Sequence, residues 1–239
     1  CAGCMVVQML VGRGWGHTGW TLDKLESIPG FDVNLSFPRV KKILKTCGMA
    51  LAGQTKNIAA ADKKIYALRD ATATVPTIPL IVASIMSKKL AEGLDALVLD
   101  VKTGSGAFIT RFPESKRLAE ALCKTGTAFG VNTEALVTDM SEPLGKYVGN
   151  ATETYEGLRI LRGETDEAMK QTLELSIELT ANMLVQTRVA STQAEAKAKI
   201  TQALNSGYAL ERFRHNIELQ GGDPSICEKP EKLLTKGLR

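Results

Sequence analysis

The sequence has few of the residues that mark disulfide-rich, zinc-binding or histidine-dependent proteins. It contains two histidines, His17 and His215, and aromatic side chains make up 5% of its 239 residues. Its five cysteines are scattered and odd in number, which argues against a disulfide framework and favours a reducing compartment such as the cytoplasm. The close pair Cys1 and Cys4 has no second pair to complete a zinc site.

Long apolar runs and blocks of like charge are also missing. No apolar stretch reaches the roughly 18 residues that a membrane span needs. The net charge of +4 is spread along the chain, so neither nucleic acid nor a membrane is the expected partner. A hydrophobic content of 44% with 23% charged residues is typical of a globular protein with a sizeable core. The net positive charge leaves room for a small anionic substrate.

Short apolar runs alternate with amphipathic stretches, which predicts an α/β fold with a largely parallel sheet flanked by helices. We expect strands at Cys4–Val11, Phe31–Leu35, Met49–Gly53, Leu94–Val101 and Asn132–Thr138. We expect helices at Thr21–Ser27, Pro38–Thr46, Ile78–Glu92, Pro113–Phe129, Glu153–Leu161, Asp166–Gln186, Thr192–Asn205 and Gly207–Gln220. Thr192 followed by Glu195 predicts a capping box. The polar stretch from Gly221 onward shows no apolar periodicity.

A glycine-rich segment follows the first expected strand and opens a helix. Gly14, Gly16 and Gly19 have the spacing of the dinucleotide-binding fingerprint, and such a turn lets the backbone approach an anion. The following helix ends before Pro29, after about two turns, which is short for the crossover helix of a dinucleotide-binding unit. The segment therefore favours an anion site over a dinucleotide site.

Another candidate segment lies on the helix expected at residues 78–92. Thr77 can serve as its N-cap, and Pro79 lies in the first turn, where its missing N–H has no cost. Ser84 and Lys88 are four residues apart and therefore share one face of this helix. By spacing alone, this pair is more typical of a solvated face than of a binding site.

Several long segments together carry a resemblance to a known family. They are Gly12–Phe31, Gly53-Gln54, Ala61-Asp62-Lys63, Tyr66–Asp70, Thr72–Val75, Ile78–Ile81, Ala83-Ser84, Ser87–Gly93, Asp100–Phe108 and Asp139–Gly145. In these segments the sequence resembles the thymidine and pyrimidine nucleoside phosphorylases, and the similarity fades after about Glu164. The resemblance implies that a pyrimidine nucleoside reacts with phosphate to give the free base and ribose or deoxyribose 1-phosphate.

The resemblance also implies a domain organisation. Residues 1–60 and 93–239 would form the nucleoside phosphorylase/phosphoribosyltransferase α/β domain, and residues 61–92 would belong to a small helical lobe. That family forms homodimers through the helical lobe. Its N-terminal helices and its Lys-His-Ser-Thr-Gly-Gly phosphate loop are expected before Cys1, and a further domain after Arg239. We therefore expect this chain to be an internal piece of such an enzyme and to be inactive alone.

The pyrimidine pocket of the family is matched residue by residue. Its Arg, Ser and Lys correspond to Arg69, Ser84 and Lys88, while Tyr66 and Ile81 match residues that flank the base. Breaking the N-glycosidic bond leaves negative charge on the departing pyrimidine, so fixed cationic donors stabilise the transition state more than the ground state. Arg69 and Lys88 are thus the expected catalytic residues.

On the phosphate side, the match to the family is only partial. Thr21 matches a phosphate-contacting threonine, and Trp15 stands where a leucine borders the base. Val11 replaces a phosphate-contacting serine of the bacterial members. His17 does not match the family's catalytic histidine. These differences leave the choice between thymidine and uridine open.

The resemblance implies no organic cofactor but suggests a metal site. In bacterial members, backbone carbonyls matching Leu144 and Tyr147 and a glutamate matching Glu156 hold potassium, and oxygen ligands suit such a hard cation. Further ligands come from an N-terminal loop, so the site here would be incomplete. Asp100 and Lys102 are expected to form a buried structural ion pair at the end of a strand.

Two alternatives remain open at this point. One is a relative of the anthranilate phosphoribosyltransferases, which use a diphosphate sugar; segments 12–31 and 100–108 fit that family less well. The other is a non-catalytic fragment or binding module.

Overall fold

The computed structural model describes residues 5–11, 21–53, 61–62, 65, 72 and 77–235. It divides into two compact units. Unit 1 comprises Cys1–Thr55, Gly145–Ile177 and Thr192–Arg239, and unit 2 comprises Lys56–Leu144 and Glu178–Ser191. The predicted domains, residues 1–60 with 93–239 and residues 61–92, stay a prediction.

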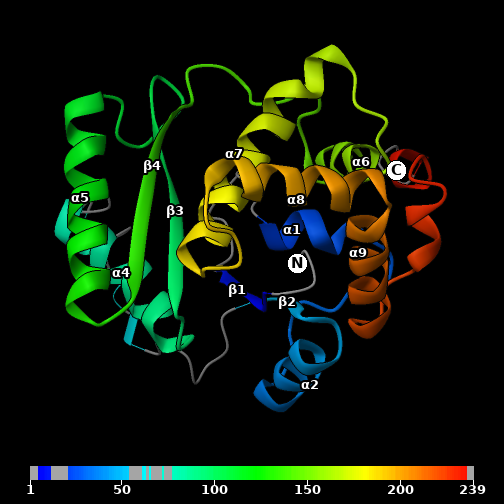
Figure 1. Ribbon diagram of the computed structural model, residues 1–239, viewed down its shortest axis with the longest axis horizontal. Helices are drawn as coiled ribbons and strands as arrows, with labels where there is room; N and C mark the ends of the chain where they lie inside the picture. The colour runs from blue at the N-terminus through cyan, green and yellow to red at the C-terminus, as the bar shows by residue number, and fades with distance from the viewer. Residues whose placement is uncertain are drawn as a thin grey trace. The chain divides into compact units, whose positions relative to one another are not determined.

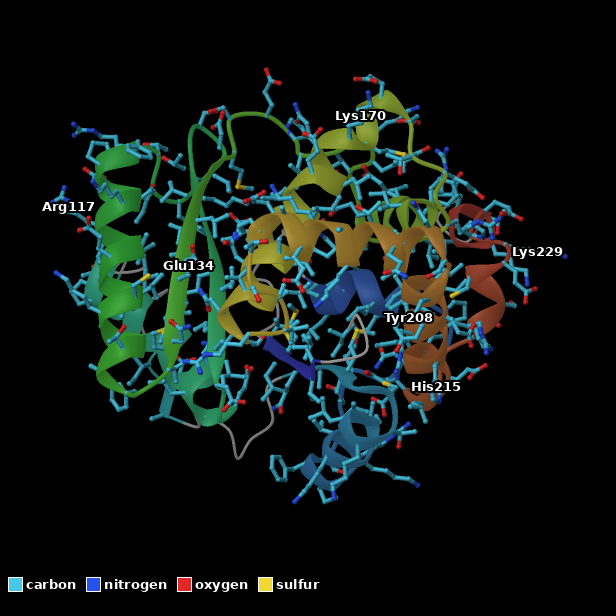
Figure 2. The ribbon with its side chains drawn as sticks, viewed as in Figure 1. Arg117, Glu134, Lys170, Tyr208, His215 and Lys229 are labelled. Carbon is cyan, nitrogen blue, oxygen red and sulfur yellow. The ribbon has the colours of Figure 1, made fainter. Side chains whose placement is uncertain are left out.

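Unit 1 contains a parallel strand pair surrounded in sequence by helices. Its strands are β1 (Val7–Val11) and β2 (Met49–Gly53), paired in register from Val7 with Met49 to Val11 with Gly53. Its helical segments are α1 (Thr21–Glu26), α2 (Phe37–Cys47), α6 (Asn150–Leu161), η1 (Glu167–Met169), α8 (Gln193–Asn205), α9 (Tyr208–Leu219), η2 (Pro224–Cys227) and α10 (Lys232–Thr235). His215 lies on α9 (Figure 2).

Unit 2 is a parallel strand pair packed against two helices. It contains α4 (Ile78–Ala91), β3 (Ala96–Thr103), α5 (Phe112–Ala128) and β4 (Asn132–Asp139). β3 and β4 pair in parallel from Ala96 with Asn132 to Thr103 with Asp139. α5 packs along both strands, and α4 packs against α5 (Figure 1). Helix α7 (Lys170–Gln186) contributes to both units.

Each unit buries its own apolar core. The core of unit 1 consists of Leu22, Leu25, Ile28, Phe31, Val33, Leu158, Ile217, Ile226, Cys227 and Leu233. The core of unit 2 consists of Val82, Met86, Leu97, Val101, Ile109, Leu118, Ala119, Leu122 and Val131. α5 approaches β4 closely at Gly126, where an added Cβ would lie 2.7 Å from the Cβ of Thr133. The mixed α/β class with parallel strands is thus confirmed.

Most predicted elements are confirmed to within a few residues. Thr77 is the N-cap of α4 by its backbone, although its side chain makes no cap hydrogen bond. The predicted capping residue Thr192 accepts a hydrogen bond from the backbone N–H of Glu195 at 3.2 Å. The polar C-terminal stretch is more ordered than its composition indicates, because η2 and α10 place Ile226, Cys227 and Leu233 in the core of unit 1. Among the described residues, no helix is both long and apolar enough to cross a membrane.

The predicted strand Phe31–Leu35 is wrong. This segment is irregular, although Phe31, Val33 and Leu35 are buried as a strand pattern requires. A single backbone bond joins it to the edge of β2, from the N–H of Gly53 to the carbonyl of Val33 at 2.8 Å. The alternating apolar residues reflect burial without sheet pairing.

The side chain of Gln220, just after α9, takes the place of that missing strand. Its amide accepts from the N–H of Leu51 at 3.1 Å and donates to the carbonyl of Leu51 at 2.8 Å, as a neighbouring strand would. The same amide nitrogen donates to the carbonyl of Asp32 at 3.0 Å, and the N–H of Asp32 donates to the carbonyl of Gln220 at 2.9 Å. Gln220 is fully buried, so water cannot replace these bonds.

We predict that Gln220→Leu lowers the free energy of unfolding by at least about 2 kcal/mol, because it leaves several backbone groups unpaired. Gln220→Glu has the same shape but sets a carboxylate oxygen against carbonyl oxygens, so it should destabilise at least as much. Gln202→Leu, at an exposed position of α8, is the matched control and should change stability little. Urea denaturation followed by circular dichroism measures all three, and equal stability of the Gln220 and Gln202 variants would contradict this role.

Candidate functional site

The pair Ser84 and Lys88, predicted from helical spacing, forms a direct contact on α4. The Nζ atom of Lys88 donates to the Oγ atom of Ser84 at 3.0 Å. Ser84 is 7% exposed, which excludes the solvated face that spacing alone favours. Ile81, one turn earlier, packs against the core of unit 2. The structure thus brings together two of the predicted pocket residues, Ser84 and Lys88, and places Ile81 beside the core.

A carboxylate from outside the predicted pocket completes the group formed by Ser84 and Lys88. The Oδ2 atom of Asp62 lies 2.7 Å from the Nζ atom of Lys88, and both side chains are largely buried. In the sequence, Asp62 belongs to the matching segment Ala61-Asp62-Lys63 and has no predicted role. No local pattern connects it with Lys88, because 26 residues separate them.

The remaining pocket residues are not placed with this pair. Trp15, Tyr66 and Arg69 lie outside the described residues, as do His17 and the predicted glycine-rich turn. Thr21 is the first residue of α1 and belongs to unit 1, whereas Ser84 and Lys88 belong to unit 2. Their predicted roles stay predictions.

The predicted ion pair between Asp100 and Lys102 is confirmed at the carboxyl end of β3. Lys102 Nζ lies 2.7 Å from Asp100 Oδ2 and donates to Thr138 Oγ1 at 2.9 Å. The hydroxyl of Thr138 donates to Asp100 Oδ1 at 2.5 Å, which closes the triangle. Both charged side chains are between a fifth and a third exposed, so the pair is only partly buried and not buried as expected. The partial exposure arises on the strand face opposite the core residues Leu97 and Val101.

The glycine-rich segment after β3 is bound to the end of β4. The N–H of Gly106 donates to the carbonyl of Met140 at 3.0 Å, and Ser105 Oγ donates to the carbonyl of Ser141 at 3.2 Å. Hydrogen bonds from the hydroxyl and the N–H of Ser141 hold the pKa of Asp139 below its usual value. These contacts fix the backbone where parallel strands end, the edge at which open α/β sheets bind ligands.

One predicted potassium ligand, Glu156, is a buried carboxylate that accepts a hydrogen bond from the backbone of another, Tyr147. Glu156 is 4% exposed, and its carboxylate accepts from the N–H of Tyr147 at 3.4 Å and from the hydroxyl of Thr172 at 3.2 Å. An added Cβ on Gly145 would collide with this carboxylate. Leu144 is exposed, and the boundary between the two units falls directly after it.

The surroundings of Glu156 fit a cation. Within the described ranges no Lys, Arg or His forms an ion pair with this carboxylate, and its two hydrogen-bond donors are neutral. A buried carboxylate that lacks a cationic partner is costly unless it is neutralised. Carboxylate oxygens are ligands that suit a hard ion such as potassium.

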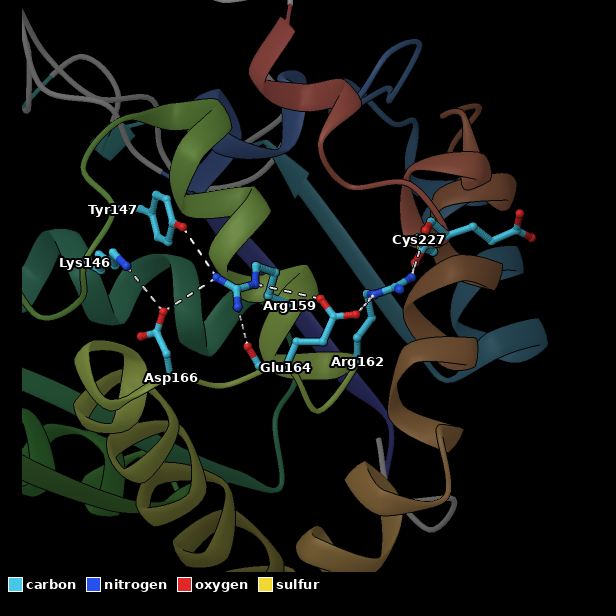
Figure 3. A network of polar contacts seen from close by, with 8 residues as sticks. Lys146, Tyr147, Arg159, Arg162, Glu164, Asp166 and Cys227 are labelled. Carbon is cyan, nitrogen blue, oxygen red and sulfur yellow. Dashed lines mark hydrogen bonds and ion pairs between the residues drawn. The ribbon is translucent and has the colours of Figure 1, made fainter.

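An ionic network braces the loop that carries Tyr147 (Figure 3). Asp166 Oδ2 lies 3.4 Å from Lys146 Nζ and 3.7 Å from Arg159 Nη1, and Arg159 also reaches the hydroxyl of Tyr147 at 3.5 Å. Although burial opposes its charge, the hydrogen bond to Tyr147 and the charge of Asp166 raise the pKa of Arg159. Next to it, Arg162 donates to the carbonyl of Cys227 at 2.8 Å and so ties η2 to the end of α6 (Figure 3).

Comparison with known proteins places the chain in a family. The family model described as "Glycosyl transferase family, a/b domain" matches residues 1–210. The chain belongs to this glycosyl transferase family. Among members similar to it, a pyrimidine-nucleoside phosphorylase of Staphylococcus aureus (strain USA300) is 47% identical over 227 residues, which is 95% of this chain and 52% of that protein.

A second relative agrees with the first. A thymidine phosphorylase of Colwellia psychrerythraea (strain 34H / ATCC BAA-681) is 46% identical over 230 residues, which is 96% of this chain and 52% of that protein. The chain therefore spans about half the length of the curated relatives it matches. The resemblance noted from the sequence is confirmed at the level of the glycosyl transferase family and of these relatives.

We predict that Gly145→Ala destabilises the domain by about 1–3 kcal/mol, because the added methyl group overlaps the carboxylate of Glu156. The matched control is Gly157→Ala, in the middle of α6, where an added Cβ meets no atom within 4 Å. That variant should be neutral or stabilising by up to about 1 kcal/mol, since alanine favours helices. Thermal unfolding measures both; equal melting temperatures would show that the loop around Gly145 yields freely.

Proposed function

We propose that this domain serves the phosphorolysis of pyrimidine nucleosides. An oxygen of inorganic phosphate bonds to C1′ of the sugar, the N-glycosidic bond breaks, and its electron pair leaves with the base. The departing pyrimidine anion takes up the proton that the phosphate loses, so the products are the free pyrimidine and ribose or deoxyribose 1-phosphate. The observation that carries the proposal is the buried contact between Lys88 and Ser84, in a chain nearly half identical to phosphorylases.

In this proposal Lys88 and Arg69 are the catalytic residues and stabilise the negative charge that gathers on the departing base. Donors that are already fixed need no reorganisation during the reaction, and they stabilise charge more strongly in a buried site than in water. Ser84 hydrogen-bonds the base. Tyr66, Ile81 and Trp15 flank the base, and Thr21 contacts phosphate. Two expectations, a homodimer and a cytoplasmic location, rest on the resemblance and on the scattered cysteines.

Activity is tested best in two forms of the protein. One is the chain alone; the other is a chimera in which the chain replaces the matching segment of the Staphylococcus aureus relative, since the chain spans half that protein's length. We expect phosphate-dependent release of thymine from thymidine or uracil from uridine by the chimera, and little by the chain alone. In the reverse reaction, which forms the nucleoside from the free base, phosphoribosyl diphosphate should not substitute for ribose or deoxyribose 1-phosphate.

Lys88→Met in the chimera should lower kcat/KM for the nucleoside by about 10²–10³-fold, as loss of a charge-stabilising donor does elsewhere. Ser84→Ala should have a smaller effect. Lys89→Met is the matched control, because Lys89 pairs with Glu92 on the same helix and should not contact the base. An active chimera in which Lys88→Met and Lys89→Met perform alike would overturn the pocket assignment.

We also propose that potassium binds at Glu156 with backbone carbonyls of Leu144 and Tyr147. Bound there, the ion supplies positive charge that neutralises the carboxylate. The support is the deep burial of Glu156 and its neutral hydrogen-bond donors.

The melting temperature of the chain should rise with potassium chloride relative to N-methylglucamine chloride at the same ionic strength. Glu156→Gln should abolish that rise and stabilise the ion-free chain, because it removes an uncompensated buried charge. Glu174→Gln, at an exposed position of α7, is the control and should keep the response. A potassium response that survives in Glu156→Gln would refute this site.

A further inference from the structure

The ammonium of Lys88 is held from two sides before any substrate arrives. Asp62 Oδ2 lies 2.7 Å from it and Ser84 Oγ lies 3.0 Å from it. The side chain of Asp62 is 8% exposed and that of Lys88 is 16% exposed, so both bonds form in a largely water-free place. A charge-assisted bond in such a place is shorter and stronger than one at the surface.

The direction of these bonds determines which donors remain. An ammonium group has three N–H donors, and two of them are used by Asp62 and Ser84. Ser84 accepts from Lys88, so its own hydroxyl proton is left to donate. Among the described residues, two donors of this group therefore have no other partner: one ammonium N–H of Lys88 and the hydroxyl of Ser84.

We propose that Asp62 is a positioning residue, which holds Lys88 against Ser84 so that both donors are fixed for the acceptor atoms of the departing pyrimidine. This inference rests on the proposed function. Asp62 acts through Lys88 and does not itself contact the base.

A carboxylate suits this task better than a neutral partner. A lysine side chain has many rotamers, and this rotamer entropy must be lost before its ammonium can act at one place. The ion pair with Asp62 fixes the side chain of Lys88 when the protein folds. Binding energy of the substrate is therefore not needed to order this side chain. The same carboxylate balances the buried ammonium charge of Lys88. Loss of Asp62 should therefore reduce kcat more than it changes KM for phosphate.

The first test uses the chain alone and does not depend on catalysis. Lysine acylation by an N-hydroxysuccinimide ester is followed by mass spectrometry, with the exposed Lys116 of α5 as internal reference. In the unmodified chain, Lys88 should react at least tenfold more slowly than Lys116. Asp62→Asn should accelerate acylation of Lys88 at least fivefold. Glu92→Gln, which removes the partner of Lys89 instead, should leave Lys88 protected.

The second test uses the chimera described above. Asp62→Asn should lower kcat for thymidine at least tenfold while KM for phosphate stays within twofold. Asp62→Glu restores the charge and should recover part of the rate. Unchanged kcat in a folded Asp62→Asn variant, or a fall in stability without any change in Lys88 acylation, would overturn the proposal.

The outcomes separate this inference from the proposed function. If the chimera shows no phosphorolysis but Asp62→Asn still unmasks Lys88, the function fails while the positioning of Lys88 stands. If the chimera shows phosphorolysis that requires Lys88, but Asp62→Asn changes neither kcat nor the acylation of Lys88, the function stands and the positioning role fails. If neither Asp62 variant folds, the acylation rates in the unmodified chain provide the test. Acylation of Lys88 as fast as that of Lys116 would contradict the buried pair of Asp62 and Lys88.

Discussion

The hydrogen bonds of one buried side-chain amide organise unit 1. Gln220 joins β2, the irregular segment at residues 31–35 and the end of α9, because its amide pairs with Leu51 as a strand would and also reaches Asp32. Asn216, one turn earlier on α9, donates to the carbonyl of Met49 at 2.9 Å and to the Gln220 amide oxygen at 3.2 Å. The helix thereby completes the edge of a sheet, and the apolar core of the unit closes around that junction.

The sequence predicts well those elements whose signals are local. β2 and α4 follow from an apolar run and from a helix start with Pro79, and β3 follows from a short apolar strand that ends in charged residues. The segment 31–35 could not be predicted, because its alternating burial is that of a strand while its pairing partner is a side chain distant in sequence. Burial patterns report which side of a chain is covered; they do not report what hydrogen-bonds its backbone.

In the candidate site, too, contacts between residues close in sequence could be predicted and contacts between distant residues could not. Ser84 and Lys88 were predictable as neighbours because four residues make about one helical turn. Their burial was not, since it depends on the packing of α4 in unit 2. Asp62 and Thr172 each approach a predicted site residue from elsewhere in the sequence, and neither spacing nor residue type identifies them in advance.

The ion pairs beside Tyr147 make its loop sensitive to salt, and this sensitivity opposes the stabilisation expected from the proposed potassium ion. Lys146, Asp166 and Arg159 are joined by ion pairs that are partly open to water, and mobile ions screen such pairs over about 10 Å at 0.1 M salt. Potassium added to fill the site at Glu156 would also weaken the contacts that order the loop beside it. At the proposed site, added potassium would therefore act on loop order in two opposite ways, by binding at Glu156 and by screening the neighbouring ion pairs.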